Sequence, residues 1–203
     1  MPTKNGPRNP EVILASASPR RRELLKQLVK RFRTVPSGVD EDIFMGRDPV
    51  ASALLAAAAK ARAVGGKYPA SLIIGADTLV TMDGEIFGKP RSREEARAIM
   101  ERLSGRRHRV ITAVVVYRKD GEKMLTGHES SWVTFKKLAH GDIEAYLESG
   151  GYHDKAGGYA IQESEDALVE RLEGDYDNVV GLPVRLLGRL LKRFSRPDGS
   201  RPG

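Results

Sequence analysis

The chain has 203 residues, which is enough for one domain with a substantial apolar core. Apolar residues make up 40% of it and charged residues 30%, as in ordinary globular proteins, and no apolar stretch is long enough to span a bilayer. Cysteine is absent, which excludes disulfides, thiolate zinc sites and cysteine nucleophiles. No apolar run of the signal-peptide type stands near the N-terminus, so the sequence predicts a cytoplasmic protein without a membrane partner.

Positive charge is concentrated at the two ends of the chain, whose formal net charge is +7. Residues 1–10 hold two basic residues and no acid, and residues 189–203 hold five basic residues and one acid. We expect a disordered basic extension at 1–10, a folded domain at 11–194 and a disordered tail at 195–203. The body of the domain carries no broad basic field, which argues against a specific nucleic-acid partner.

Apolar periodicity and turn signals predict a regular series of elements. Ser18-Pro19 is a helix cap followed by proline at the first helical position, and Asp48-Pro49 repeats that start signal. Asp83-Gly84 marks a tight hairpin turn. The elements expected in the first half are a strand at 12–15, a helix from 18 to about 30, a helix from 48 to about 65, and strands at 72–74, 79–82 and 85–87.

The second half continues the alternation of helices and strands. Ser92 with Glu95 forms a capping box, and Asp120-Gly121 marks a turn. The expected elements are a helix at 92–105, strands at 108–117 and 125–135, a helix at 142–149, a polar strand pair after the glycine-rich segment 150–158, and an amphipathic helix ending at 194. Hairpins among alternating strands and helices predict an α/β fold with a mixed, twisted sheet flanked by helices.

Three consecutive arginines, Arg20, Arg21 and Arg22, open the first helix. Cations at this end oppose the positive pole of the helix dipole, where acidic residues are preferred. Arg20 and Arg21 also lie four residues before Leu24 and Leu25, above the buried stripe of the helix. The arrangement indicates a docking site for an anion, bound by backbone N–H groups and guanidinium forks. The simpler alternative is a solvated basic turn.

Carboxylates stand where α/β sheets gather their ligands. Asp77 follows the apolar strand at 72–74. Ligands collect beyond the carboxyl ends of strands, and a carboxylate there can hold a magnesium ion or polarise a water. Alternatively, Asp77 caps a turn. Asp40-Glu41-Asp42 offers further oxygen ligands, or forms a solvated acidic loop.

Lysines in tight loops complete the set of charged residues. Lys89 lies between a glycine and a proline, which fix the backbone, and Lys155 lies close to a pair of glycines. Lys60 lies on the side of its helix opposite to Leu54 and Leu55, a position typical of a surface lysine. The four histidines show no metal-ligand spacing, and phosphate-loop, dinucleotide-binding and serine-hydrolase patterns are absent. Such a set fits a metal-bound polyphosphate better than acyl or hydride chemistry.

These motifs resemble those of the Maf family in type and order. The run from Ala15 to Leu25 matches the opening signature of the family, and the resemblance extends to about residue 190. The further matching motifs are Asp40-Glu41, Lys60-Ala61, Ala76-Asp77-Thr78, Gly88-Lys89-Pro90, Leu103-Ser104-Gly105, residues 154–162 and Val180-Gly181-Leu182-Pro183.

The resemblance implies a fold with two lobes around a cleft, shared with inosine triphosphate pyrophosphatases, and a homodimer. It implies that dTTP and UTP, or modified pyrimidine nucleotides, are hydrolysed between the α and β phosphorus atoms with Mg²⁺ or Mn²⁺. By position, Asp77 is the expected general base and, together with Glu41, the expected metal ligand. The residues expected to bind the substrate are Ser18, Arg20, Arg21, Lys60, Thr78, Lys89, Lys155 and Gln162.

Three positions separate two branches of the family. Arg20, Thr78 and Gln162 are the residues of the dTTP/UTP branch, whereas the branch that prefers 7-methyl-GTP has tryptophan, glutamine and glutamate there. Glu163 departs from the family pattern, which has glycine after the glutamine, and this affects the loop beside the base pocket. Family members have been linked to arrest of cell division. The alternative function is therefore a regulatory protein, or a nucleic-acid-binding protein that uses its basic ends.

Overall fold

The computed structural model describes residues 10–46 and 48–196, except for the side chains of residues 163–166. The extension predicted at 1–10 therefore lies outside the described residues apart from Pro10, as does the tail predicted at 195–203 apart from Ser195 and Arg196. None of the helices in the described part is long and apolar enough to cross a membrane.

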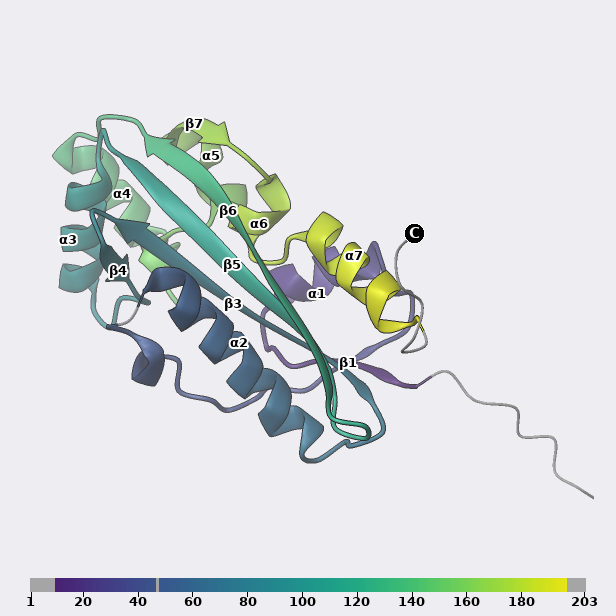
Figure 1. Cartoon of the computed structure of the whole chain (residues 1–203). Coiled ribbons are helices and arrows are strands. Elements are labelled where there is room, and N and C mark those ends of the chain that lie inside the picture. Colours follow the sequence, from purple (N-terminus) through teal and green to yellow (C-terminus); the bar gives the residue numbers. More distant parts are fainter. Residues whose placement is uncertain (1–9, 47, 197–203) are drawn as a thin grey trace, which may run out of the picture.

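Within the described residues, seven strands form one mixed sheet (Figure 1). Neighbouring strands follow the order β2-β1-β3-β5-β6-β7, and β4 pairs with β3. β1 is parallel to both of its neighbours and the other pairings are antiparallel, so the predicted mixed α/β sheet is confirmed. The strands are β1 (Val12–Leu14), β2 (Arg33–Thr34), β3 (Leu72–Met82), β4 (Glu85–Phe87), β5 (Arg107–Arg118), β6 (Lys123–Phe135) and β7 (Val169–Glu173).

Helices pack on both faces of this sheet. α2 crosses one face over β3 and β5, and the longest of the other helices contribute to the apolar core on the opposite face (Figure 1). The helices are α1 (Pro19–Lys26), α2 (Pro49–Gly65), α3 (Arg93–Leu103), α4 (His140–Glu148), α5 (Ile161–Leu168), α6 (Tyr176–Val180) and α7 (Val184–Phe194), with short 3₁₀ turns η1 (Asp42–Phe44) and η2 (Ala156–Gly158).

Alternation along the central strands divides the apolar residues between two cores. Ile73 of β3 faces α2, whereas the adjacent Ile74 joins the core on the other face, as successive strand residues must. α2 meets the sheet through alanines such as Ala57 and Ala61. Gly75 makes this close approach possible, because a Cβ there would lie 2.4 Å from the backbone oxygen of Ala57.

Two elements near the N-terminal half differ in extent from the prediction. α1 ends at Lys26 and not near residue 30, because the chain turns there toward β2; Val29 and Phe32 pack against the core from outside the helix. β3 is one continuous strand and not two short ones, because it pairs with β5 along the stretch from Ile73 to Thr81.

The polar strand pair predicted after residue 158 is wrong. α5 occupies the first part of this segment, and β7 is the single strand that follows it. Ile161 and Leu168 are both buried and lie seven residues apart, which is two helical turns. The first part of the segment therefore forms a helix with one buried face, and the strand that follows, β7, pairs with β6.

A gap along one edge of β3 creates room for a site. β1 pairs with β3 over Leu72–Ile74, and β4 pairs with it over Val80–Met82. Between these two neighbours, residues 75–79 have no strand partner on that side among the residues that the structure describes, while β5 pairs with the other edge. The gap also lies just beyond the carboxyl end of β1, where open α/β sheets bind their ligands.

Candidate active site

A cavity of about 460 Å³ opens at this gap, which is the size of a small-molecule site. Its walls come from the loop after β1, the start of α1, the loop before η1, α2, β3, and the segment between α4 and α5. The residues predicted to bind substrate or metal, or to act as a base, all line it: Ser18, Arg20, Arg21, Glu41, Lys60, Asp77, Thr78, Lys89, Lys155 and Gln162. The fold thus gathers residues that are up to 144 positions apart in the sequence into one hollow.

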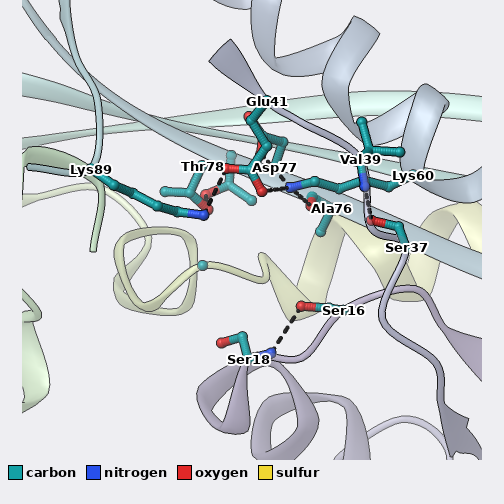
Figure 2. Close-up of polar contacts among 12 residues, drawn as sticks. Ser16, Ser18, Ser37, Val39, Glu41, Lys60, Ala76, Asp77, Thr78 and Lys89 are labelled. Carbon is teal, nitrogen blue, oxygen red and sulfur yellow. Dashed lines mark hydrogen bonds and ion pairs between the residues drawn. The ribbon is translucent and has the colours of Figure 1, made fainter. Parts of the chain in front are cut away.

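Four of these residues form a charged cluster: Glu41, Lys60, Asp77 and Lys89. The ammonium nitrogen of Lys60 lies 2.7 Å from Oδ1 of Asp77 and also contacts Glu41. Lys89 reaches the other carboxylate oxygen of Glu41 at 2.8 Å. Figure 2 shows Lys60 pointing to the two carboxylates, with Ser18 across the open space from them. The cluster therefore alternates positive and negative groups along one wall of the cavity.

Lys60 is only 3% exposed, so its surface placement expected from the helix pattern is wrong. It stands three residues after Ala57, on the alanine face that α2 turns to the sheet. Asp77 lies two residues after Gly75, on the face of β3 that α2 covers. Lys60 also donates to the backbone oxygen of Ala76 at 3.4 Å. Its ammonium group therefore occupies the position that a neighbouring strand would fill.

Burial and pairing act in opposite directions on the two carboxyl groups. Burial raises the pKa of Asp77, and the nearby Glu41 adds to this, while Lys60 and Arg21 oppose it. Burial also raises the pKa of Glu41, but Lys60 and Lys89 outweigh it and lower that pKa to about 2. Glu41 is consequently ionised at neutral pH, and Asp77 has a stronger affinity for a proton than an exposed aspartate.

One oxygen of Asp77 is well suited to hold a cation or a water. Oδ2 is buried and has no hydrogen-bond partner among the described residues. No group of three or more acidic or histidine side chains that could hold a metal ion gathers in the described part of the chain, so that part offers no complete cage. Magnesium commonly binds through one or two carboxylates together with phosphate oxygens of a substrate. The donor set fits a divalent ion that arrives with a polyphosphate.

The start of α1 forms another wall of the cavity. Ser18 caps the helix as predicted, accepting a hydrogen bond from the backbone nitrogen of Arg21 at 3.4 Å, and Pro19 follows it. No acidic residue stands in the first turn. Arg21 is held through Nε, which donates to the oxygen of Gly181 at 2.9 Å, and through Nη2, which donates to Thr78 at 3.0 Å. The half-buried guanidinium of Arg21 therefore faces the hollow in a fixed orientation, at the positive end of the helix dipole.

A glycine-rich loop carries Lys155 to the cavity. Its ammonium group donates to the backbone oxygen of Gly151 at 2.6 Å. Gly157 has φ of +66°, and a Cβ there would lie 2.7 Å from a methyl group of Val80, so glycine is required for this loop to pack on β3. Gln162 follows at the start of α5 and is exposed. The side chain of Glu163 lies outside the described residues, so its expected effect on the base pocket stays a prediction.

Several residues that support the site were not expected from the sequence. Thr112 and Asn178 form hydrogen bonds behind Thr78, and Tyr159 lines the cavity while contacting His108. The available signal was a polar residue inside an apolar run, as with Thr112 between Ile111 and Ala113 of β5. That signal does not identify the partner, which depends on how α6 packs on the sheet.

Comparison with known proteins identifies the group to which the chain is similar. A family model described as Maf-like protein matches residues 11–194. A dTTP/UTP pyrophosphatase of Pelotomaculum thermopropionicum is 45% identical over 184 residues, covering 91% of this chain and 96% of that protein. A protein of the same description from Pyrococcus furiosus is 44% identical, covering 90% and 94% respectively. A third from Deinococcus radiodurans is 44% identical and covers 95% of each chain.

A solved structure supports the fold. The structure of the Staphylococcus aureus Ham1 protein superimposes with a TM-score of 0.51 and 15% sequence identity, covering 91% of this chain and 100% of that one. At this identity the similarity concerns the arrangement of helices and strands alone.

Proposed function

Because this chain belongs to the Maf family, we propose that it is a nucleoside triphosphate pyrophosphatase that hydrolyses dTTP and UTP to the monophosphate and pyrophosphate. Its similarity to relatives described as dTTP/UTP pyrophosphatases extends over nine-tenths of the chain. The observation that carries the proposal is the buried, unpartnered oxygen of Asp77 beside a row of basic groups in one cavity.

Asp77 is the general base of this reaction. A water held by its carboxylate attacks the α phosphorus, the bond from that phosphorus to the bridging oxygen breaks, and pyrophosphate leaves. The proton of the water passes to Asp77, whose pKa is raised by burial. Lys60, 2.7 Å away, opposes this effect by favouring the ionised carboxylate, and it fixes the orientation of that group.

The basic residues bind and stabilise the phosphates. Arg21 and the N-terminus of α1 face the hollow from one side, and Lys89 and Lys155 from others. Charge that develops on the leaving pyrophosphate is stabilised by such preorganised donors in a site partly closed to water. Ser18 adds a polar group at the start of the helix. Arg20, Thr78 and Gln162 are assigned to recognition of the base.

A divalent cation, Mg²⁺ or Mn²⁺, belongs to this proposal. Asp77 would hold it through the free oxygen Oδ2, with Glu41 close by. When bound, such an ion neutralises charge on the phosphates of the substrate.

The homodimer and the cytoplasmic location expected from the sequence also belong to the proposal. Sedimentation equilibrium of the full chain tests the first, with twice the mass of one chain as the expected result.

A nucleotide panel tests the activity. Purified protein should convert dTTP and UTP to monophosphate and pyrophosphate when Mg²⁺ or Mn²⁺ is present, and excess chelator should abolish the reaction. Ion-exchange separation of the nucleotides distinguishes monophosphate from diphosphate products. A protein that releases orthophosphate and leaves a diphosphate, or that is fully active in chelator, would overturn the proposal.

A further inference from the structure

A chain of hydrogen bonds runs from the cavity into the sheet. Nη2 of Arg21 donates to the hydroxyl oxygen of Thr78 at 3.0 Å, and this oxygen lies 2.9 Å from the hydroxyl oxygen of Thr112. Thr112 in turn donates to the backbone oxygen of Asn178 at 2.8 Å. Thr78 and Thr112 stand directly opposite each other on β3 and β5, so their side chains share one face of the sheet.

The first donor and the last acceptor of this hydrogen-bond series determine which group donates in each bond between them. A guanidinium group can only donate, and a carbonyl oxygen can only accept. Thr112 has a single hydroxyl proton, which it gives to Asn178. The contact between the two threonines therefore needs the proton of Thr78, which must point at Thr112. If Thr112 donated to Thr78 instead, its hydroxyl oxygen would face the carbonyl oxygen of Asn178 at 2.8 Å without a proton between them, in a buried position.

Thr78 consequently faces the cavity as an acceptor. Its proton is directed to Thr112, and one of its two lone pairs accepts from Arg21. The remaining lone pair is available to a ligand, because Thr78 lines the cavity and is half-buried. An oxygen that only accepts repels a phosphate oxygen and suits an N–H group. Uracil and thymine carry such a group at ring position N3, whereas cytosine has an acceptor there.

The partners of Thr112 are themselves rigid. Asn178 is 0% exposed, and its side chain accepts from the backbone nitrogen of Thr112 at 3.1 Å and donates to Val110 and Ser131. Thr112 is also 0% exposed and is not among the residues that line the cavity. It can therefore act on a ligand only through Thr78.

We propose that Thr112 is a positioning residue that commits Thr78 to accept a hydrogen bond, so that the site selects a base with a ring N–H over one with a ring acceptor. This inference rests on the proposed function, because it concerns which nucleotide the same cavity prefers. It assigns selectivity to a residue on the strand behind the site.

The experiment is to measure kcat/KM for dTTP and dCTP on the wild type and on Thr112→Val. Valine has the shape of threonine but leaves the hydroxyl of Thr78 free to rotate and to donate into the cavity. The ratio of dTTP to dCTP kcat/KM should fall roughly threefold to tenfold, as expected for one altered hydrogen bond. Thr112→Ser keeps the hydroxyl and should restore the ratio.

Thr81→Val is the matched control. Thr81 lies on β3, is 6% exposed and donates to a backbone oxygen, that of Glu85, at 2.7 Å, but does not line the cavity. The control should keep the wild-type ratio. Thermal unfolding checks each variant, and Thr112→Cys replaces Thr112→Val if the latter does not fold, since a thiol is a weak donor of similar size.

The outcomes separate the inference from the function on which it rests. A wild type that hydrolyses neither dTTP nor UTP overturns the proposed function. An active wild type whose ratio is unchanged by Thr112→Val, is not restored by Thr112→Ser, or falls equally in Thr81→Val overturns the role of Thr112 alone.

Discussion

The charged cluster lines the cavity, and so does Tyr159, whose partner His108 is buried behind it, yet the two regions differ in how they accommodate burial. Nε2 of His108 lies 2.7 Å from the hydroxyl of Tyr159, and Phe135 contacts both rings edge-on. Burial lowers the pKa of His108 to about 4 and raises that of Tyr159, so both groups are neutral at pH 7. Lys60 is buried and Glu41 is partly buried in their wall of the cavity, and each of them faces a group of opposite charge.

This difference indicates that the pair of His108 and Tyr159 has a structural role, whereas the charged cluster has a chemical one. A neutral hydrogen-bonded pair satisfies buried polar atoms at modest cost, and it anchors the loop that carries Lys155 to β5. Buried ion pairs are costly to assemble and are often no more stable than apolar replacements. The charged cluster is therefore better explained by the reaction than by stability. Substitutions in one of these two regions leave the other unchanged, so the two contributions can be measured separately.

The largest effect is expected from Asp77→Asn. This change removes the base while keeping the shape of the side chain, and turnover should fall by on the order of 10²–10⁴-fold. The comparison variant is Asp83→Asn, in the exposed turn after the same strand, where the carboxylate pairs with Arg106 at the surface. Asp83→Asn should keep wild-type turnover. If Asp77→Asn folds and stays within a few-fold of the wild type, Asp77 is not the base.

Lys60→Met should lower stability as well as activity, because Lys60 both pairs with the buried carboxylates and orients the base. It leaves two carboxyl groups facing each other without the ammonium that both contact. Breaking a buried pair in this way costs about 3–5 kcal/mol of unfolding free energy at neutral pH. Adding Asp77→Asn to Lys60→Met should recover part of that loss, because the amide needs no counter-charge. Urea unfolding of both single variants and the double variant measures this coupling, with Lys67→Met as the surface control; strictly additive losses would contradict it.

The neutral pair should make stability depend on pH between 7 and 5. The histidine takes up a proton near pH 6.5 in the unfolded chain but only near pH 4 in the folded protein. Below pH 6.5 the unfolded state therefore binds more protons, and stability falls as the pH is lowered. The loss is about 2 kcal/mol between pH 7 and pH 5.

Urea unfolding of the wild type and of His108→Gln at both pH values measures this contribution. The difference between the two proteins cancels the groups that they share, Asp77 included, and should shrink by the stated amount at pH 5. His128→Gln, at an exposed position, controls for the loss of a histidine. A difference for His108→Gln that is the same at both pH values would show that its ring is not kept neutral by burial.

The sequence predicted the helix starts and hairpin turns from local causes, and its resemblance to the Maf family predicted the residues that line the cavity. Ser18-Pro19 is a helix-start signal that depends only on neighbouring residues. Asp83-Gly84 forms a hairpin turn, with φ of +54° and +82°. The placement of Lys60 by helix pattern failed because α2 buries alanines and not its leucines. That choice depends on Gly75 of another element, which lets the two backbones approach.

Other features depend on register between distant segments, which local patterns do not encode. Thr112 meets Thr78 because β3 and β5 pair in one register, and it meets Asn178 because α6 lies against β5. A shift of one residue would turn Thr112 to the face that α2 covers. The strand pair predicted after residue 158 failed for a related reason: polar residues of α5 mask a buried spacing of two turns between Ile161 and Leu168.

The central claim, that Asp77 directs a water to the α phosphorus, is tested most directly by hydrolysis of dTTP in H₂¹⁸O. Mass spectrometry of the two products locates the oxygen that entered. Attack at the α phosphorus predicts one ¹⁸O atom in dTMP and none in pyrophosphate, and Asp77→Asn should slow the appearance of labelled dTMP. Label in pyrophosphate would place the attack at the β phosphorus and contradict the account.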